Sequence, residues 1–152
     1  MQFAADPSPP PARPPRDGRG WQLLLFASAA ATVLATRWPW VRVKFERLFG
    51  NYSGPPAWQS TVGFTCLCTS LMVAVMALAE SGTPSSRNAV RPGSLLLACV
   101  ALMTLVASVL QGPGELRSVS ATWTEWFYLA AIGLPLLFAA CLQRWRNSRF
   151  PG

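Results

Sequence analysis

The chain has 152 residues, of which 51% are hydrophobic and only 12% are charged, and its formal net charge is +7. Soluble domains usually carry about 25% charged residues, so this composition excludes an ordinary water-soluble domain. The chain contains no histidine, which excludes imidazole acid–base catalysis, histidine-ligated metal sites and Ser-His-Asp triads.

The first 20 residues form a tail rich in proline and arginine. Residues 7–19 contain six prolines and three arginines. A segment of this kind has too little apolar surface to fold around a core, and its prolines favour an extended backbone. We therefore predict a disordered or polyproline-like tail over residues 1–20.

Four apolar stretches follow the tail, at about residues 21–36, 60–79, 94–111 and 124–143. A hydrocarbon core about 30 Å thick is crossed by about 20 helical residues, with a range of about 17 to 25. Lipid offers no partner to an unpaired backbone group, so each span must be a helix. The sequence predicts an all-α membrane domain over residues 21–146, a small four-transmembrane-helix bundle, with a short C-terminal tail at 147–152.

The first stretch also fits a different interpretation. It is short, it follows three arginines and it contains three consecutive alanines at 29–31, which is the layout of a secretory signal peptide. However, Trp38 and Trp40 follow Arg37, and tryptophans beside an arginine are typical of a helix end at a membrane surface. We favour a retained helix, with Trp21 at its other end. A cleaved signal would leave three spans, and a re-entrant or surface helix is a further alternative.

The distribution of positive charge predicts the orientation. With four spans, eight arginines lie on the side of the two termini and five cationic residues lie on the opposite side. The first group is Arg13, Arg16, Arg19, Arg87, Arg91, Arg144, Arg146 and Arg149, and the second is Arg37, Arg42, Lys44, Arg47 and Arg117. Short cytoplasmic loops are enriched in Lys and Arg, so we expect both termini in the cytoplasm.

The loop after the first stretch contains an amphipathic segment at residues 41–49. On a helix, Val41, Phe45, Leu48 and Phe49 would share one face, which suggests a segment lying in the membrane interface. As a strand, Val41, Val43 and Phe45 would alternate equally well. Residues 50–56 contain two glycines and two prolines, which predict an irregular connection. The segment is either a basic turn against lipid headgroups or a surface that docks a partner.

The ends of the apolar stretches carry local signals. Residues 122–125, Thr-Trp-Thr-Glu, match a capping box, which assigns Glu125 to helix capping. Gly82 is placed to end the second helix, and Pro92 with Gly93 predicts a turn before the third. Pro135 falls inside the fourth helix, where it removes a backbone donor.

The remaining reactive groups do not form a recognisable site. The six carboxylates lie in the tail, in loops or at helix ends, and no pair has a spacing that would hold a metal. Cys66 and Cys68 are two residues apart, about 200° around a helix, so their thiols point away from each other. With Cys99 and Cys141 they are interpreted as small buried hydrophobic residues. We predict no catalytic, cofactor-binding or metal site and no bound cofactor.

Small and weakly polar residues recur at helical spacing in every stretch. Such stripes let membrane helices approach closely. They fit packing within one bundle, and they also fit a lateral contact with another subunit. The residues are Ala27, Ala31 and Ala35; Ser28, Thr32 and Thr36; Thr61, Thr65 and Thr69; Ala101, Thr104 and Ser108; and Ala130 with Gly133.

These features predict a non-catalytic, multi-pass membrane protein that acts as an accessory or scaffold subunit of a membrane assembly. Its expected partners are the lipid bilayer and either another membrane subunit or a second copy, with no nucleic acid. The second hypothesis is a component of a transporter or channel that works as an oligomer. That class normally places ionisable residues within the membrane, and beyond Glu125 the last three stretches have none. An enzyme acting on lipid, with Glu125 as its acid, is the third hypothesis.

Overall fold

The computed structural model describes residues 19–45, 50–80, 84–113 and 119–149. Residues 1–18 of the tail predicted over residues 1–20, and the predicted helix end at Gly82, therefore lie outside the described residues. The described elements, in chain order, are helix α1 (Arg19–Ala35), strands β1 (Val41–Phe45) and β2 (Asn51–Ser53), the 3-10 turn η1 (Ala57–Gln59), helices α2 (Thr61–Ala79) and α3 (Pro84–Gln111), strand β3 (Val119–Trp123) and helix α4 (Glu125–Arg149).

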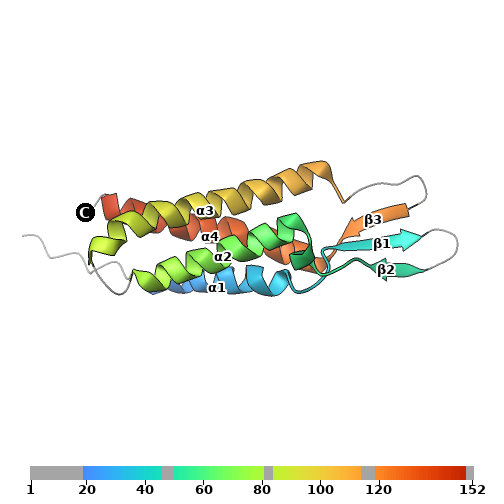
Figure 1. Cartoon of the computed structure of the whole chain (residues 1–152), viewed down its shortest axis with the longest axis horizontal. Helices are drawn as coiled ribbons and strands as arrows, with labels where there is room; N and C mark the ends of the chain where they lie inside the picture. The colour runs from blue at the N-terminus through green and yellow to red at the C-terminus, as the bar shows by residue number, and fades with distance from the viewer. Residues whose placement is uncertain (1–18, 46–49, 81–83, 114–118, 150–152) are drawn as a thin grey trace, which may run out of the picture.

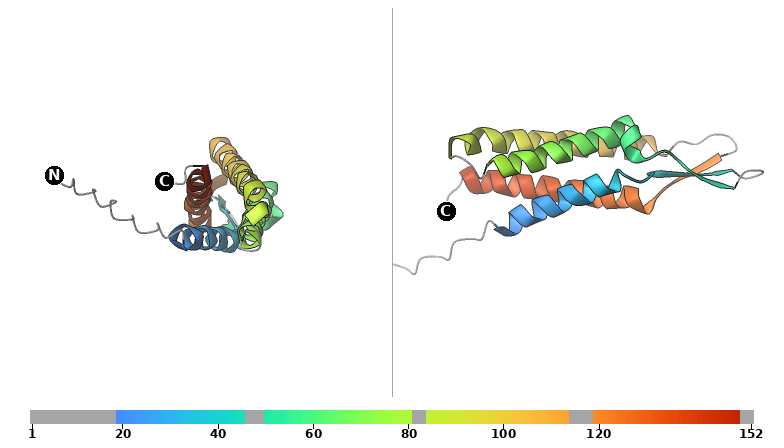
Figure 2. Two further views of the ribbon diagram at one scale, coloured as in Figure 1. Left: turned by 90° about the vertical axis from the view of Figure 1, so that its left-hand side faces the viewer. Right: turned by 60° about the horizontal axis from the view of Figure 1, so that its bottom comes forward.

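The four helices lie side by side in an elongated bundle, and the three strands form a small sheet at one end of it (Figure 1). Helix α1 packs against α2 and α4, and α3 packs against the same two helices, which gives the ring of four helices seen end-on in Figure 2. The described start of α1 and the end of α4 lie at the end of the bundle opposite the sheet. The two ends of the molecule therefore differ in structure.

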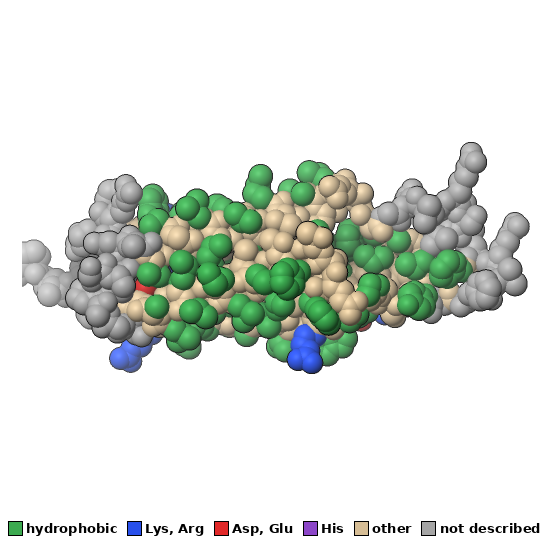
Figure 3. Space-filling view, viewed as in Figure 1, with side chains coloured by type: hydrophobic (Ala, Val, Ile, Leu, Met, Phe, Trp, Pro, Cys, Tyr) green, Lys and Arg blue, Asp and Glu red, His purple; other side chains and the backbone are tan. Residues whose placement is uncertain are grey.

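Three of the helices are long and apolar enough to cross a membrane. They are α2, the segment Val90–Gln111 of α3 and the segment Glu125–Asn147 of α4. Hydrophobic side chains are spread along the whole helical part of the face shown in Figure 3. Helix α1 is apolar but has only 17 residues. The prediction of apolar helices long enough to cross a membrane is confirmed for α2, α3 and α4, and a span formed by α1 stays a prediction.

Small side chains allow α1 and α4 to approach closely. Ser28 and Thr32 of α1 are buried, and the Thr32 hydroxyl donates to the Ser28 carbonyl at 2.9 Å. A Cβ atom placed on Gly133 of α4 would lie only 2.8 Å from Thr32 Oγ1. Glycine at this position is therefore required by the contact. The stripe of Ser28 and Thr32 therefore packs within the bundle, which is one of the two predicted alternatives.

The prediction of an all-α domain is wrong for the loops, because described loop residues form a small sheet. For the segment at residues 41–49, the helix is wrong for Val41–Phe45 and the alternative of a strand is correct, while residues 46–49 lie outside the described residues. Val41–Phe45 form the central strand of an antiparallel sheet with the order β2-β1-β3. The irregular connection predicted for residues 50–56 is interrupted by strand β2. The alternation of Val41, Val43 and Phe45 is compatible with a strand, and β1 pairs with a strand on each side. One of them, β3, comes from the loop before α4.

Three helix boundaries also differ from the prediction. Helix α1 begins at Arg19, within the predicted tail, and α4 continues to Arg149. The turn predicted at Pro92 is wrong, because α3 begins at Pro84 and continues through this proline. Pro92 removes one helical donor, and it lies at the edge of the apolar segment, where water can satisfy the freed carbonyl. Pro135 lies inside α4 as predicted.

The capping box predicted for residues 122–125 is wrong. Thr122 belongs to β3, where its hydroxyl donates to the Arg42 carbonyl at 3.4 Å, and α4 begins only at Glu125, so Thr122 is not at the start of the helix. A true side-chain cap occurs at α2, where the Ser60 hydroxyl accepts from the Gly63 amide at 3.0 Å. Pairing of Thr122 with Arg42 in the sheet therefore overrides the local motif.

The close contact at Gly133 can be tested by adding one methyl group. We expect Gly133→Ala to lower the free energy of unfolding by about 1–3 kcal/mol, because overpacking forces a packed neighbour to move. Gly133→Ala combined with Thr32→Ala should recover part of the loss, since the clashing hydroxyl is removed. Gly20→Ala is the control, because nothing lies within 4 Å of that position. Unfolding in detergent measures each variant, and equal stability of Gly133→Ala and wild type would contradict the contact.

Candidate functional site: the two ends of the bundle

The sheet has one apolar face and one polar face. Antiparallel pairing places Val43 opposite both Tyr52 and Ala121, and Val41 opposite Trp123, on the same face. The other face carries Arg42 and Lys44 of β1 and, from the neighbouring strands, Ser53, Ser120 and Thr122. On the apolar face Tyr52 is 63% exposed, while Val41 and Val43 are half-buried. This face is therefore only partly covered by the rest of the chain.

Buried polar contacts fix the sheet to the bundle. The indole N–H of Trp40 donates to the Ala35 carbonyl at the end of α1, at 2.9 Å. The backbone amide of Thr124 donates to the Trp40 carbonyl at 2.9 Å, and its hydroxyl donates to Pro39 at 2.7 Å. Buried hydrogen bonds of this kind restrict relative movement, because breaking one leaves an unsatisfied polar group. The ends of α1 and α4 and the sheet are thus held together.

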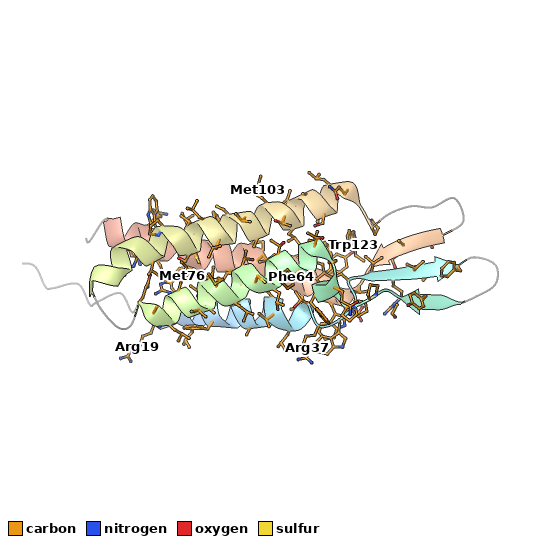
Figure 4. The ribbon with its side chains drawn as sticks, viewed as in Figure 1. Arg19, Arg37, Phe64, Met76, Met103 and Trp123 are labelled. Atoms are coloured by element: carbon orange, nitrogen blue, oxygen red, sulfur yellow. The ribbon has the colours of Figure 1, made fainter. Side chains whose placement is uncertain are left out.

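An aromatic cluster fills the junction between sheet and helices, where Trp123 is labelled in Figure 4. Trp123 stacks on Phe127 with a centroid distance of 4.0 Å, and Trp40 meets the edge of the same ring at 5.6 Å. Trp38 stacks on Trp126 at 4.2 Å. Aromatic pairs add about 0.5–1.5 kcal/mol each beyond burial, and tryptophan is favoured at the membrane interface. The junction marks the level at which the chain leaves the apolar region.

Glu125, the residue considered as an acid for catalysis, lies at this end and is exposed. Its side chain is 70% exposed, and its nearest described cation is Arg42 at 4.0 Å. An exposed pair at this distance contributes little to stability. The side chain is not buried, and burial is one of the features that tune a carboxyl group for acid catalysis.

The opposite end of the bundle contains a buried carboxylate that the sequence analysis placed only at a helix end. Glu80 follows α2 and is 6% exposed. One of its oxygens accepts from Nη2 of Arg144 in α4, and the other lies 3.5 Å from Nε of Arg91 in α3. The residue thereby joins three helices. Its separation of 64 residues from Arg144 leaves no local signal in the sequence.

The described residues do not bring other reactive groups together. Cys66 and Cys141 are buried, Cys68 and Cys99 are half-buried, and all four are free thiols. Among the described ranges, no group of three or more His, Cys, Asp or Glu side chains could hold a metal ion. The hydroxyl groups of the helices mostly donate to carbonyls of their own helix; Thr69 and Thr104 are examples. These groups act in packing within the bundle.

Comparisons with known proteins identified no relative of this chain. No family model matches the sequence, and neither the curated proteins nor the solved structures include a significant match.

The two glutamates at opposite ends of the bundle give a matched test. We expect Glu80→Gln to lower the free energy of unfolding by roughly 3 kcal/mol, because it leaves two partly buried arginines without their carboxylate. Glu125→Gln should change it by less than about 0.5 kcal/mol, since that side chain is exposed. Both variants are compared by unfolding in the same detergent. Equal effects would show that the Glu80 contacts contribute nothing to the bundle.

Proposed function

We propose that this protein is a non-catalytic accessory subunit of a membrane assembly, and that it presents the three-stranded sheet to another membrane subunit. In this proposal the chain spans the membrane four times, with both termini in the cytoplasm and the sheet on the opposite side. The observation that carries the proposal is the partly exposed apolar face of a sheet fixed to the helices.

A connection between two helices does not need such a sheet. This chain uses segments from two separate loops to build it and buried hydrogen bonds to hold it. The sheet extends beyond the helix ends along the long axis of the bundle (Figures 1 and 2), so it projects away from the bilayer. A half-exposed apolar face in that position favours a protein partner over lipid.

The dimensions and flanks of α1 support a fourth span. Its 17 residues correspond to about 26 Å at 1.5 Å per residue, near the lower limit for crossing the hydrocarbon core. Arg19 and Arg37 lie at its two ends and point outward from the bundle (Figure 4). Helix α1 also packs against both α2 and α4, as a spanning helix of the bundle would.

A transporter or channel is less well supported by the described residues. Their charged side chains lie at the two ends of the bundle, in or beside the ends of the apolar segments. Ion or substrate coupling usually requires ionisable groups at membrane depth. The interior contains small hydrophobic residues and hydroxyls instead, such as Ala101, Ala130 and Thr32.

The orientation can be measured with reporter fusions in cells. We expect a fusion at residue 85 and one at the C-terminus to report the cytoplasm, and a reporter inserted at residue 52 to report the opposite side, because the arginine-rich end favours the cytoplasm. A fusion after Trp21, made without the rest of the chain, serves as the cytoplasmic control. If residue 52 and the C-terminus report the same side, the four-span proposal is wrong.

The partner proposal is tested by gentle extraction of the tagged chain from native membranes. We expect a complex larger than the 16.5 kDa chain, with one different membrane protein in constant ratio. Tyr52→Lys should weaken its capture by about thirtyfold, because an exposed aromatic residue at a contact commonly contributes about 2 kcal/mol. Tyr52→Phe, which keeps the ring, is the matched control and should retain the partner.

Two results would overturn the proposal. One is recovery of a lone chain, or of copies of this chain only, from both detergent and native-lipid particles. The other is full retention of the partner by Tyr52→Lys and by a second variant on the same face, Phe45→Lys, while both keep wild-type unfolding temperatures.

A further inference from the structure

A polar pocket of about 230 Å³ lies at the end of the bundle opposite the sheet. It is lined by Trp21 and Gln22 of α1, Arg91 of α3, and Arg144 and Asn147 of α4. A water molecule occupies about 30 Å³ in the liquid, so the pocket has room for about eight waters or for one compact polar group with its first substituents. Its walls come from three different helices.

The pocket lies at the depth of the lipid headgroups. The apolar segment of α2 ends at Ala79, that of α3 begins at Val90, and that of α4 ends at Asn147. The lining residues are therefore beside the ends of the hydrophobic segments. The abundant anion at this depth of a bilayer is phosphate. Trp21 also lies here, as tryptophan often does at the membrane interface.

The described charged side chains at the pocket carry a net positive charge. Glu80 faces both Arg91 and Arg144, so these three side chains carry a net charge of +1. Both guanidinium groups are largely withdrawn from solvent, with side chains 26% and 19% exposed. A partly buried charge is stabilised by a counter-ion, and an anion in the pocket would supply one.

The two arginines of the pocket carry more hydrogen-bond donors than the Glu80 carboxylate can accept. Two guanidinium groups carry ten N–H donors, and one carboxylate accepts about four hydrogen bonds. Nε of Arg91 is buried without a hydrogen bond among the described residues, since its 3.5 Å contact with Glu80 lacks hydrogen-bond geometry. The Asn147 amide oxygen accepts from Gln143 at 3.4 Å, which leaves its NH₂ group as a donor. Arginine donors arranged around a pocket favour the several oxygens of a phosphate group.

We propose that the pocket formed by Trp21, Gln22, Arg91, Arg144 and Asn147 binds a phosphate group, supplied either by an anionic phospholipid of the surrounding leaflet or by free phosphate in the aqueous phase. Glu80 positions the two arginines by holding one oxygen toward each of them. The site does not depend on a protein partner, and it lies at the opposite end of the bundle from the sheet.

The test measures ligand binding to the purified full-length chain in neutral detergent by native mass spectrometry and by the shift in unfolding temperature. The probes are phosphatidylglycerol, phosphatidylcholine and inorganic phosphate. Gln22→Leu with Asn147→Leu removes pocket donors and leaves the Glu80 contacts in place. Arg146→Gln is the control. Arg146 is exposed and does not line the pocket, so this substitution removes a positive charge at the same end without changing the pocket.

We expect phosphatidylglycerol to bind at least about tenfold more tightly than phosphatidylcholine, and the double variant to lose about tenfold, as for a lost hydrogen bond to a charged group. Arg146→Gln should bind as wild type. Stabilisation by inorganic phosphate that the double variant loses would identify the free anion as the source. Equal affinity for both lipids with no response to phosphate would overturn the proposal. So would an equal loss in Arg146→Gln, which would indicate diffuse attraction to positive charge.

Discussion

Hydrocarbon offers no partner to an unpaired polar group, and this constraint decides where each polar side chain of the protein lies. Within the helices, hydroxyl groups donate to carbonyls of the preceding turn; Ser28, Thr69 and Thr104 all do so. The charged side chains of the described segments lie at the two ends of the bundle. Ser70 is the exception, because its buried hydroxyl has no described partner. In the middle of the bundle, the described helices are therefore held together by side-chain packing.

Packing of apolar helices in lipid depends on close approach, since there is little hydrophobic drive to bring them together. Two glycines provide that approach. Gly133 lets α4 contact Thr32, and Gly63 lets α2 lie against η1, where an added Cβ would be 2.0 Å from the Ala57 carbonyl oxygen. The contact of Gly63 with η1 lies where the chain passes from the sheet into α2. Gly133 therefore allows close packing within the bundle, and Gly63 allows close packing where the sheet joins it.

The sequence was sufficient for features that depend on local composition. Length and hydropathy located the apolar helices, and the stripe through Ser28 and Thr32 was recognised from its spacing. The sheet was not predictable, because β1 pairs with β3, whose residues lie almost 80 positions later, and short alternating segments fit a helix as well as a strand. The Glu80 contacts are likewise between distant residues. The predicted capping box fails for the same reason, since Thr122 pairs with the distant Arg42 in the sheet and does not lie at the start of α4.

The two functional proposals concern opposite ends of the molecule, yet they depend on one pair of helices. Helices α1 and α4 hold the sheet through Trp40 and Thr124, and they supply four of the five residues that line the pocket. The contact of Gly133 with Thr32 joins the same two helices between these ends. A close-packed contact has few alternative arrangements, so it fixes the two helices relative to each other. The contact therefore supports the relative position of the two helices that hold the sheet and line most of the pocket.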